Sequence, residues 1–481
     1  MAKDRLLGRN LLFSGGAAIS NIFLIIVGVA AARILHDKAF GEFSFALAIA
    51  SIFETGIELG ISTLVVRNIS RNRELAGLYV TNVLGWKLCL SIISMSLMVI
   101  TVNLLHQSET AKTAAYIMGG AIVLRSYKGS THAFFQSYER FDLILLTTYV
   151  ERVLVLAATL GTLLISHRLI PFVTAFALAR IPDLAFSLIL VHRRIVPIKF
   201  ALPSWTIIKE LQLKALPFGL AAVVGSCYSY IGTVILSSLT NFESVGWYNA
   251  SYKIYEGLTM FPYLICSVFL PKLSLLYTTS PEKYSAVSIN WLRYIILASI
   301  PVIFVAGVYS PHVILLFYGA EYLPAIGLLK ILLIAAVLMF ANSTLTTILN
   351  SSDGEKLVLK VSCLGLLVMS AANILLVHRF GVKGAPYSVV ISEGFVLLLY
   401  SAAIGRRLFS MPLLSMAWRP LIASAAGGLM IHLFQVKTPG LTALTFVAVY
   451  IGALAALGTF GTDDVEAIKG LLPASTSNLD A

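Results

Sequence analysis

Long apolar stretches with charged side chains near their centres constrain this chain most strongly. Fourteen long apolar stretches follow one another between Leu11 and Phe460, and several of them carry charged side chains near their centres. A helix needs about 20 apolar residues to span a bilayer. A charge in the middle of a spanning helix costs about 2.5–3.5 kcal/mol on insertion scales, so it normally faces a water-filled cavity or a partner. The pattern predicts an all-α integral membrane protein with a polar interior, which is typical of transporters.

The composition excludes a soluble domain. Hydrophobic residues make up 58% of the 481 residues and charged residues only 12%, whereas soluble domains average about 25% charged residues. The four cysteines lie in apolar runs without CxxC spacing or a histidine cluster, so we predict no metal site and no bound cofactor. We attribute the net charge of +12 to cytoplasmic loops rather than to nucleic acid binding.

The apolar runs also predict the topology. With the N-terminus inside, the cytoplasmic segments hold nearly three times as many Lys and Arg residues as the outside loops. This excess predicts a multi-pass protein of the cell (inner) membrane with both termini in the cytoplasm. The predicted spans are 11–34, 43–66, 81–105, 113–137, 143–166, 169–191, 215–239, 246–270, 289–316, 324–349, 357–378, 383–404, 413–434 and 440–460.

A faint internal repeat predicts two lobes. Residues 39–49 resemble residues 244–254, and residues 133–139 resemble residues 347–353. The two copies are six spans apart and share one orientation, so we expect two six-helix lobes around a central cavity. We place the N-terminal lobe at 1–191, a cytoplasmic linker at 192–214 with a short amphipathic helix from Ser204 to Lys214, the C-terminal lobe at 215–404, two extra helices at 405–460 and a cytoplasmic tail at 461–481.

Five segments, spread along most of the length of the chain, resemble the polysaccharide and O-antigen flippases of the MATE-like (MOP) superfamily. They are Ala32–Ser44, Glu58–Gly60 with Val66–Arg67, Phe134–Phe141, Val245–Ala250 and Leu316–Tyr322. One departure is His36, where that family usually has glycine.

The resemblance implies a flippase without a catalytic site. Its substrate would be an undecaprenyl-pyrophosphate-linked oligosaccharide, an O-antigen or exopolysaccharide repeat unit, moved from the inner to the outer leaflet by alternating access without ATP. The implied partners are this lipid-linked oligosaccharide, membrane lipids, and a glycan polymerase with its export machinery. We expect a monomer, and coupling to H⁺, Na⁺ or voltage is open.

Basic side chains in the spans are candidate contacts for such an anionic headgroup, because a guanidinium group can bond phosphate oxygens through two N–H groups. Arg125, Lys128 and His132 share one face of the fourth span. The alternative is structural pairing with acids on neighbouring helices. We predict that Arg293 and Lys330, which lie near helix ends, snorkel toward the membrane surface. For Lys87, both snorkelling and a headgroup contact are open. The candidate headgroup contacts are Arg125, Lys128, His132, Arg152, Arg180 and Lys87.

Acids in the first lobe are candidate coupling residues. Glu54 and Glu58 lie one turn apart, and two carboxylates so close favour binding of a proton or cation. They are equally suited to pair with the fourth span. Asp183 is a third candidate, although we favour its pairing with Arg180 beside a kink at Pro182. We expect no pair between the adjacent residues Glu151 and Arg152.

Aromatic side chains in the second lobe suit sugar rings. Tyr228, Tyr230, Tyr252 and Tyr255 are the candidate glycan contacts, while Tyr248 is expected in the interfacial belt. Glu393 lies alone at mid-depth and needs a partner that the sequence does not identify.

Three other functions were weighed. A MATE-type exporter of cationic drugs is disfavoured, because the interior holds eight Lys and Arg residues and only six acids. An interior with more positive than negative charge is unfavourable for organic cations. A lipid II flippase is disfavoured because that family places arginines in its first helix, whereas residues 14–32 of this chain contain none. A membrane enzyme would need an active site, and we find no nucleophile motif or large outside loop.

Overall fold

The computed structural model describes residues 2–198, 204–411, 413–434 and 438–459, with side chains from Ile22 onward except 413 and 414. Every regular element in these ranges is a helix. The elements are α1 (Ala2–Glu58), α2 (Ile61–Arg71), α3 (Leu75–Leu104), α4 (Glu109–Ser137), α5 (Phe141–Ile165), α6 (Leu169–Leu178), α7 (Arg180–Arg194), α8 (Trp205–Leu239), α9 (Phe242–Leu258), α10 (Met260–Thr279), α11 (Pro281–Phe317), η1 (Ala320–Tyr322), α12 (Leu323–Asn350), α13 (Glu355–Phe380), η2 (Gly381–Lys383), α14 (Gly384–Arg407), α15 (Leu413–Leu433) and α16 (Pro439–Ala456).

Nine helical segments of the described residues are long and apolar enough to cross a membrane, judged by length and composition. One of these segments, Glu355–Arg407, combines two predicted spans, 357–378 and 383–404. The all-α membrane class is therefore confirmed, while the number of fourteen spans stays a prediction. The predicted tail at 461–481 lies outside the described residues.

Breaks in the helices correct several predicted span boundaries. The predicted separation of the first two spans is confirmed: α1 consists of two helices that meet at a kink, where His36 is non-helical with φ 65° and ψ 173°. The second span does not continue to 66, because Leu59 and Gly60 have φ values of 35° and 78°. A positive φ ends an α-helix, and Gly60 adopts it without a Cβ clash.

Two further boundaries follow from local chemistry. The helix is interrupted just before Pro182, where a kink is predicted, because α6 ends at Leu178 and α7 begins at Arg180. Pro182 has no N–H for the carbonyl of Leu178 four residues earlier, so the helix breaks there. The separate amphipathic helix expected at Ser204–Lys214 is wrong: α8 continues through it from Trp205 to Leu239, with Pro217 inside the helix.

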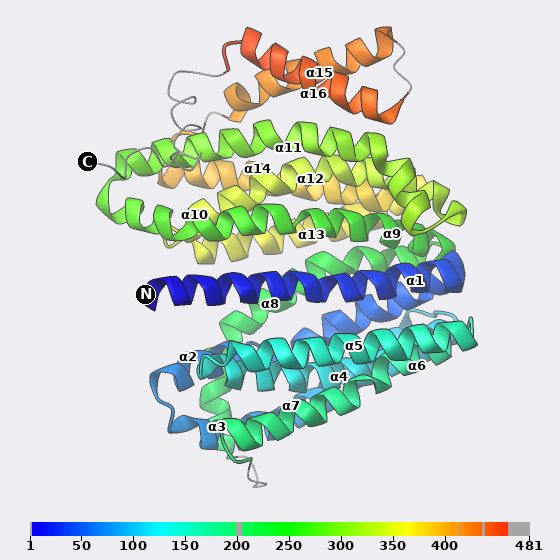
Figure 1. Cartoon of the computed structure of the whole chain (residues 1–481), viewed down its shortest axis with the longest axis vertical. Coiled ribbons are helices and arrows are strands. Elements are labelled where there is room, and N and C mark those ends of the chain that lie inside the picture. The colour runs from blue at the N-terminus through cyan, green and yellow to red at the C-terminus, as the bar shows by residue number, and fades with distance from the viewer. Residues whose placement is uncertain (1, 199–203, 412, 435–437, 460–481) are drawn as a thin grey trace, which may run out of the picture. The chain divides into compact units, whose positions relative to one another are not determined.

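The described chain forms two compact units. Unit 1 comprises residues 1–253, 314–328 and 362–392, and unit 2 comprises residues 254–313, 329–361 and 393–481. In unit 1, α4 lies among α1, α2, α3, α5, α6 and α7, and α1 also packs along α8 (Figure 1). This central place of α4 brings its charged side chains close to four neighbouring helices.

Unit 2 has an apolar core where α16 meets α15 and α11. Phe446 and Tyr450 of α16 are buried against Leu297 of α11 and Ala423 of α15. The ring of Phe304 stacks on Phe446, and the Tyr450 hydroxyl donates to the Leu297 carbonyl at 3.1 Å. These contacts pack the middle of α16 against the middle of α11 and against α15.

Glycines let α1 approach its neighbours in unit 1 at backbone distance. A Cβ on Gly60 would lie 2.4 Å from the carbonyl oxygen of Ala215, and one on Gly219 would lie 2.5 Å from the carbonyl carbon of Leu59. Gly41 and Gly246, which are equivalent in the internal repeat, also pack closely: a Cβ on Gly41 would lie 3.0 Å from the Gly246 nitrogen. These crossings exclude any side chain.

Candidate functional site

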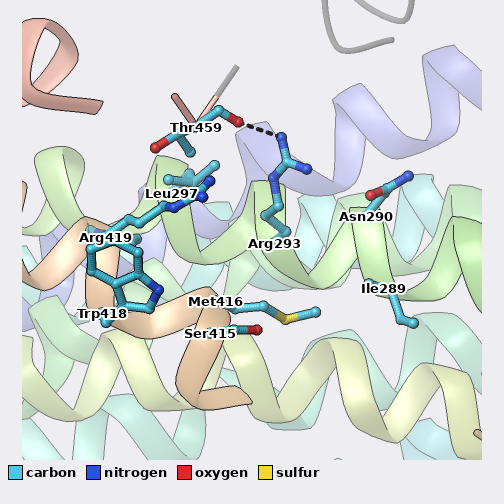
Figure 2. Close-up of a pocket in the computed structure, with 10 residues that line it drawn as sticks. Ile289, Asn290, Arg293, Leu297, Ser415, Met416, Trp418, Arg419 and Thr459 are labelled. Atoms are coloured by element: carbon cyan, nitrogen blue, oxygen red, sulfur yellow. Dashed lines mark hydrogen bonds between the residues drawn. The ribbon is translucent and has the colours of Figure 1, made fainter. Parts of the chain in front are cut away.

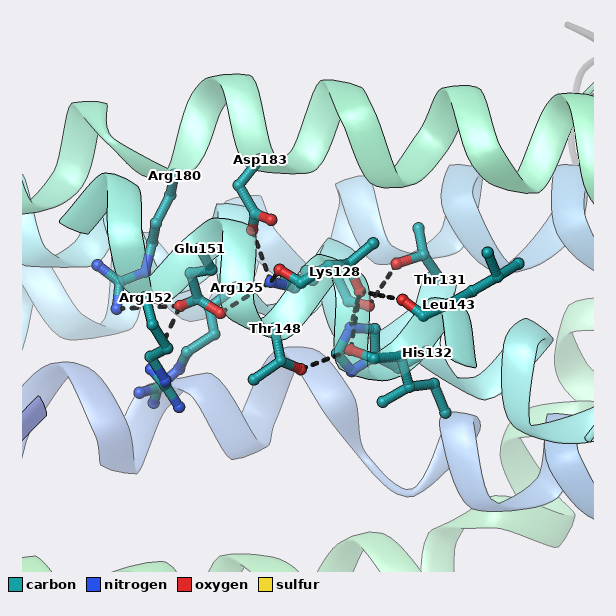
Figure 3. Close-up of polar contacts among 12 residues, drawn as sticks. Arg125, Lys128, Thr131, His132, Leu143, Thr148, Glu151, Arg152, Arg180 and Asp183 are labelled. Carbon is teal, nitrogen blue, oxygen red and sulfur yellow. Dashed lines mark hydrogen bonds and ion pairs between the residues drawn. The ribbon is translucent and has the colours of Figure 1, made fainter. Parts of the chain in front are cut away.

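Nine charged side chains from five helices of unit 1 meet around α4. Figure 3 shows six of them, on α4, α5 and α7. Five are basic and four are acidic, so the cluster carries one excess positive charge. We call these residues the α4 charge cluster: Glu54 and Glu58 of α1, Lys87 of α3, Arg125 and Lys128 of α4, Glu151 and Arg152 of α5, and Arg180 and Asp183 of α7.

Lys128 is the buried centre of the cluster. Its ammonium nitrogen lies 2.8 Å from Glu151 Oε2 and 2.8 Å from Asp183 Oδ2, and it donates to the Thr147 carbonyl at 2.9 Å. One cation thus joins α4, α5 and α7. Two carboxylates and a carbonyl satisfy its three N–H donors.

The pairing expected between Arg180 and Asp183 is not the one formed. Asp183 contacts Lys128, whereas a guanidinium nitrogen of Arg180 lies 3.7 Å from Glu151 Oε1. Arg180 also donates to the Phe176 carbonyl at 2.8 Å and lies over the Phe176 ring. The expected pair fails because Lys128 enters from α4 and takes the carboxylate of Asp183.

Arg125 is the most accessible cation of the cluster. It binds Glu54 through two hydrogen bonds, with Nε donating to Oε1 at 2.6 Å and a terminal nitrogen donating to Oε2. Its side chain is 37% exposed, against 6% for Lys128. Arg125 therefore combines a fixed orientation with access from outside the cluster.

Arg152 is held next to Arg125 in the same network. One of its terminal nitrogens lies 3.6 Å from Glu151 Oε1, and its side chain is 17% exposed. We expected no contact between these adjacent residues. The contact forms because the long arginine side chain folds back toward the carboxylate (Figure 3). The Nε atoms of Arg152 and Arg180 and the Oδ1 atom of Asp183 are buried without a hydrogen-bond partner among the described residues.

Lys87 does not snorkel to a membrane surface. Its side chain is fully buried, and its ammonium nitrogen lies 2.5 Å from Glu58 Oε2 and 2.7 Å from the Ser126 carbonyl oxygen. Glu58 Oε1 accepts a hydrogen bond from the Ser62 nitrogen at 3.2 Å. The snorkelling interpretation of Lys87 is therefore wrong, because Glu58 binds it inside the bundle.

His132, the third residue on the predicted face of α4, contacts an uncharged side chain. Its Nε2 lies 2.9 Å from Thr147 Oγ1 of α5. The pairing alternative for the other two cations is thus observed, with Glu54, Glu151 and Asp183 as partners. A substrate role for the same groups stays a prediction, as does ion coupling through Glu54, Glu58 or Asp183.

The four candidate tyrosines come from α8 and α9. Tyr228, Tyr230 and Tyr252 belong to unit 1, and Tyr255 belongs to unit 2. The Tyr228 hydroxyl lies 3.1 Å from Ser392 Oγ, and the Tyr252 ring packs on Tyr248. Glycan contact by these residues stays a prediction.

Sequence reasoning missed the partner of Glu393. Asn342 of α12 donates to Glu393 Oε2 at 2.7 Å and to the Glu393 carbonyl at 2.9 Å. Both residues are buried. An amide near the middle of an apolar span was the available signal, because a buried amide needs partners of its own.

Sequence reasoning also missed polar contacts at the His36 kink. Arg33 donates to the carbonyls of Leu315, Leu316 and Phe317 at the end of α11. His36 Nδ1 lies 2.9 Å from Glu321. The Trp247 indole donates to Asp37 Oδ2 at 3.0 Å. Polar residues that make these contacts lie in three of the segments that carry the family resemblance. The sequence does not show that these three segments meet in the fold.

Comparisons with known proteins assign the fold. The structure matches a lipid II flippase, MurJ, in an inward closed conformation with a TM-score of 0.74 at 17% identity, covering 93% of this chain and 98% of that one. It matches an inward-facing multidrug resistance MATE transporter of the MOP superfamily with a TM-score of 0.65 at 15% identity, covering 81% and 94%. At these identities the likeness is one of fold.

The sequence comparisons assign the family. An uncharacterized membrane protein of Methanocaldococcus jannaschii is 23% identical over 255 residues, which is 52% of this chain and 50% of that relative, so the match spans about half the length of each. The family model described as polysaccharide biosynthesis protein matches residues 7–276. Because that match covers more than half of the chain, this protein belongs to the polysaccharide biosynthesis protein family and has the fold of MOP-superfamily transporters.

Proposed function

We propose that the protein is a flippase for a lipid-linked oligosaccharide whose lipid is undecaprenyl pyrophosphate. It moves this substrate from the inner to the outer leaflet of the cell membrane by alternating access, with both of its termini in the cytoplasm. The family and fold support a transporter of this kind. The observation that carries the substrate class is the excess positive charge of the α4 charge cluster.

The headgroup contact is best assigned to Arg125 and Arg152. A buried ion pair is expensive to break, because the group left behind stays uncompensated in low dielectric. Arg125 is 37% exposed and Arg152 is 17% exposed, whereas Lys128 is 6% exposed. Solvent weakens a more exposed pair, so an incoming pyrophosphate can replace Glu54 at Arg125 at lower cost. Lys128, Lys87 and Arg180 then act as structural connections.

Glu54 is the best candidate for ion coupling. It is bound by Arg125 in the structure, and it loses this partner when a phosphate takes the guanidinium group. A carboxylate released in this way gains affinity for a proton or Na⁺. Coupling of H⁺ or Na⁺ to transport therefore follows from competition between Glu54 and the headgroup for one arginine.

A flippase for lipid II is the second candidate, favoured by the structural match to MurJ. Both substrates carry a pyrophosphate, so the same cations would serve either one. The partners proposed here, a glycan polymerase and its export machinery, apply only to the oligosaccharide flippase.

Flipping in proteoliposomes tests the proposal. Fluorescent undecaprenyl-pyrophosphate oligosaccharide is reconstituted with the wild type, Arg125→Gln or the control Arg140→Gln, whose guanidinium pairs with Asp142 outside the cluster. We expect Arg125→Gln to lose flipping and the control to retain it.

Three results would overturn the proposal. The first is normal flipping by Arg125→Gln. The second is equal flipping of the neutral undecaprenol-linked glycan, because the cations would then have no role. The third is transport of ethidium in place of the lipid, which would identify a cation exporter.

A further inference from the structure

The kink of α1 lies in unit 1 at a junction of three chain segments that are far apart in the sequence. They are residues 33–38 at the kink, residues 315–322 from the end of α11 through η1, and residues 242–247 at the start of α9. We call these three segments the His36 latch. The predicted topology puts the latch on the outer side of the membrane.

Contacts that do not depend on the charge of His36 hold the kink in place. The Nε atom of Arg33 donates to the Phe317 carbonyl at 3.0 Å, and a terminal nitrogen donates to the Leu316 carbonyl. The Tyr322 hydroxyl donates to the Ala32 carbonyl at 3.1 Å. A cation is favoured beside the carbonyls at the end of a helix, so Arg33 caps α11 from the kink of α1.

A distant arginine that caps a helix end also occurs in unit 2, where its role is structural. A terminal nitrogen of Arg293 donates to the Thr459 carbonyl at 2.8 Å, just after α16 (Figure 2). Arg419 donates to the Gly458 carbonyl at 3.1 Å. This fixed contact replaces the snorkelling predicted for Arg293. The kink of α1 differs because a histidine and a carboxylate meet beside its arginine.

His36 has a backbone conformation that a histidine rarely adopts. Its φ of 65° and ψ of 173° fall in a region that is populated essentially by glycine. A strained residue of this kind persists only where the surrounding structure holds it. The Nδ1 atom of His36 lies 2.9 Å from each carboxylate oxygen of Glu321. The imidazole is therefore one of the groups that hold the kink against η1.

The pair between His36 and Glu321 is the part of the latch that responds to pH. Histidine changes charge between about pH 5 and 8, whereas the other side chains present here ordinarily titrate outside this range. The other charged or titratable residues of the latch are Arg33, Asp37 and Lys38 at the kink, Glu243 on α9, and Tyr318, Glu321 and Tyr322 after α11. Beyond the latch, Glu42 faces α4, where its carboxylate accepts hydrogen bonds from Ser108 and Thr110.

We propose that the His36 latch is a pH-sensitive switch on the outer face of the protein. When His36 is protonated, its imidazolium group pairs with Glu321 and holds the kink of α1 against η1. When His36 is neutral, the pair loses its charge and the kink separates from η1 more often. The closed latch thus binds the proton more tightly than the open one, so acidity outside the membrane favours closure. The switch does not involve the transported substrate and stands whether or not the proposed function is correct.

Double electron–electron resonance on the full-length protein in lipid nanodiscs tests the switch. Spin labels are attached at Lys38→Cys and Leu323→Cys, two exposed positions on opposite sides of the latch, after the native cysteines are replaced by serine. The distance distribution is recorded at about pH 5.5 and about pH 8, on either side of the histidine range. The labelled parent is compared with His36→Asn and Glu321→Gln.

The matched control is His106→Asn. His106 is an exposed histidine with φ 50° in the turn before α4, outside the latch. Asparagine is among the residues that tolerate a positive φ best, so the two histidine variants differ in the contact that they remove. Glu321→Gln removes the charge of the pair without touching the strained residue.

We expect the short-distance population of the labelled parent to fall from the lower to the higher pH. The side chains of His36 and Glu321 are 66% and 52% exposed, so the ratio of closed to open molecules should change by about two- to fivefold, as for an exposed ion pair. His106→Asn should show the same change. His36→Asn and Glu321→Gln should stay at the ratio that the parent has at the higher pH.

Three results would overturn the proposal. The first is a distance distribution of the parent that is the same at both pH values. The second is a pH response that survives in His36→Asn or Glu321→Gln, because another group would then be the sensor. The third is a response that His106→Asn removes, which would place the sensor between α3 and α4.

Discussion

The ammonium group of Lys87 lies 2.5 Å from the carboxylate of Glu58, and the Lys87 side chain is fully buried. This pair joins α3 to the last turn of α1, directly before the break at Leu59 and Gly60. The Ser126 carbonyl adds α4 to the same junction. The sequence predicts both residues as candidates for the transport site. In the structure their pair also joins α1, α3 and α4.

Removing Lys87 alone should destabilise the fold. In Lys87→Met, the carboxylate of Glu58, whose side chain is 27% exposed, keeps its charge without its cation. Removing one partner of a fully buried pair costs about 3–5 kcal/mol, so the cost here is at most of that size. We expect a clearly lower melting temperature in detergent, measured by fluorescence-detected size exclusion after heating. The double variant Lys87→Met/Glu58→Gln should recover part of the loss.

The control for this prediction is Lys214→Met, which breaks the exposed pair between Lys214 and Glu210. It should melt as the wild type does, because exposed pairs contribute little. A Lys87→Met protein that also melts as the wild type does would show that the buried pair has no structural role.

The contact between α8 and the break that follows α1 should not tolerate a methyl group. In Gly219→Ala the new Cβ would lie 2.5 Å from the Leu59 carbonyl carbon, and backbone atoms cannot move aside as a side chain can. Gly225→Ala, in the same helix, meets nothing within 4 Å. We expect Gly219→Ala to lower the melting temperature. Gly225→Ala should raise or preserve it, because alanine favours a helix over glycine by about 1 kcal/mol. Equal melting temperatures would contradict the close crossing.

Asn342 should stabilise unit 2 through Glu393. Replacing it with leucine removes two donors from a buried carboxylate and carbonyl, and leaving a buried acceptor without its donor costs about 1–3 kcal/mol. We expect a lower melting temperature for Asn342→Leu than for Asn103→Leu, whose amide is exposed and bonds only to its own helix. Retained stability in Asn342→Leu would mean that Glu393 does not depend on this amide.

Glu54→Gln tests ion coupling. A glutamine cannot bind or release a proton, so a transporter coupled through this carboxylate should lose the pH dependence of flipping while it keeps Arg125 for the headgroup. Flipping of the lipid-linked oligosaccharide is measured in proteoliposomes at several pH values, with the exposed Glu282→Gln as control. The coupling proposal is wrong if the wild type shows no pH dependence, or if Glu54→Gln keeps the dependence of the wild type.

The length of the apolar runs determined the class of this protein without any tertiary information, because a spanning helix satisfies its backbone within one segment. Local chemistry likewise placed the break near Pro182. The face shared by Arg125 and Lys128 followed from helical periodicity, as did their need for acids.

Which acid meets which cation was decided only by the tertiary structure. Asp183 lies one turn from Arg180, yet it pairs with Lys128 because α4 inserts its cation between α5 and α7. The sequence of its own helix suggests that Lys87 snorkels at a helix end, whereas in the structure its ammonium group pairs with Glu58. Ion pairs between helices depend on packing and on the reach of long side chains, and the sequence of one helix carries no record of its neighbours.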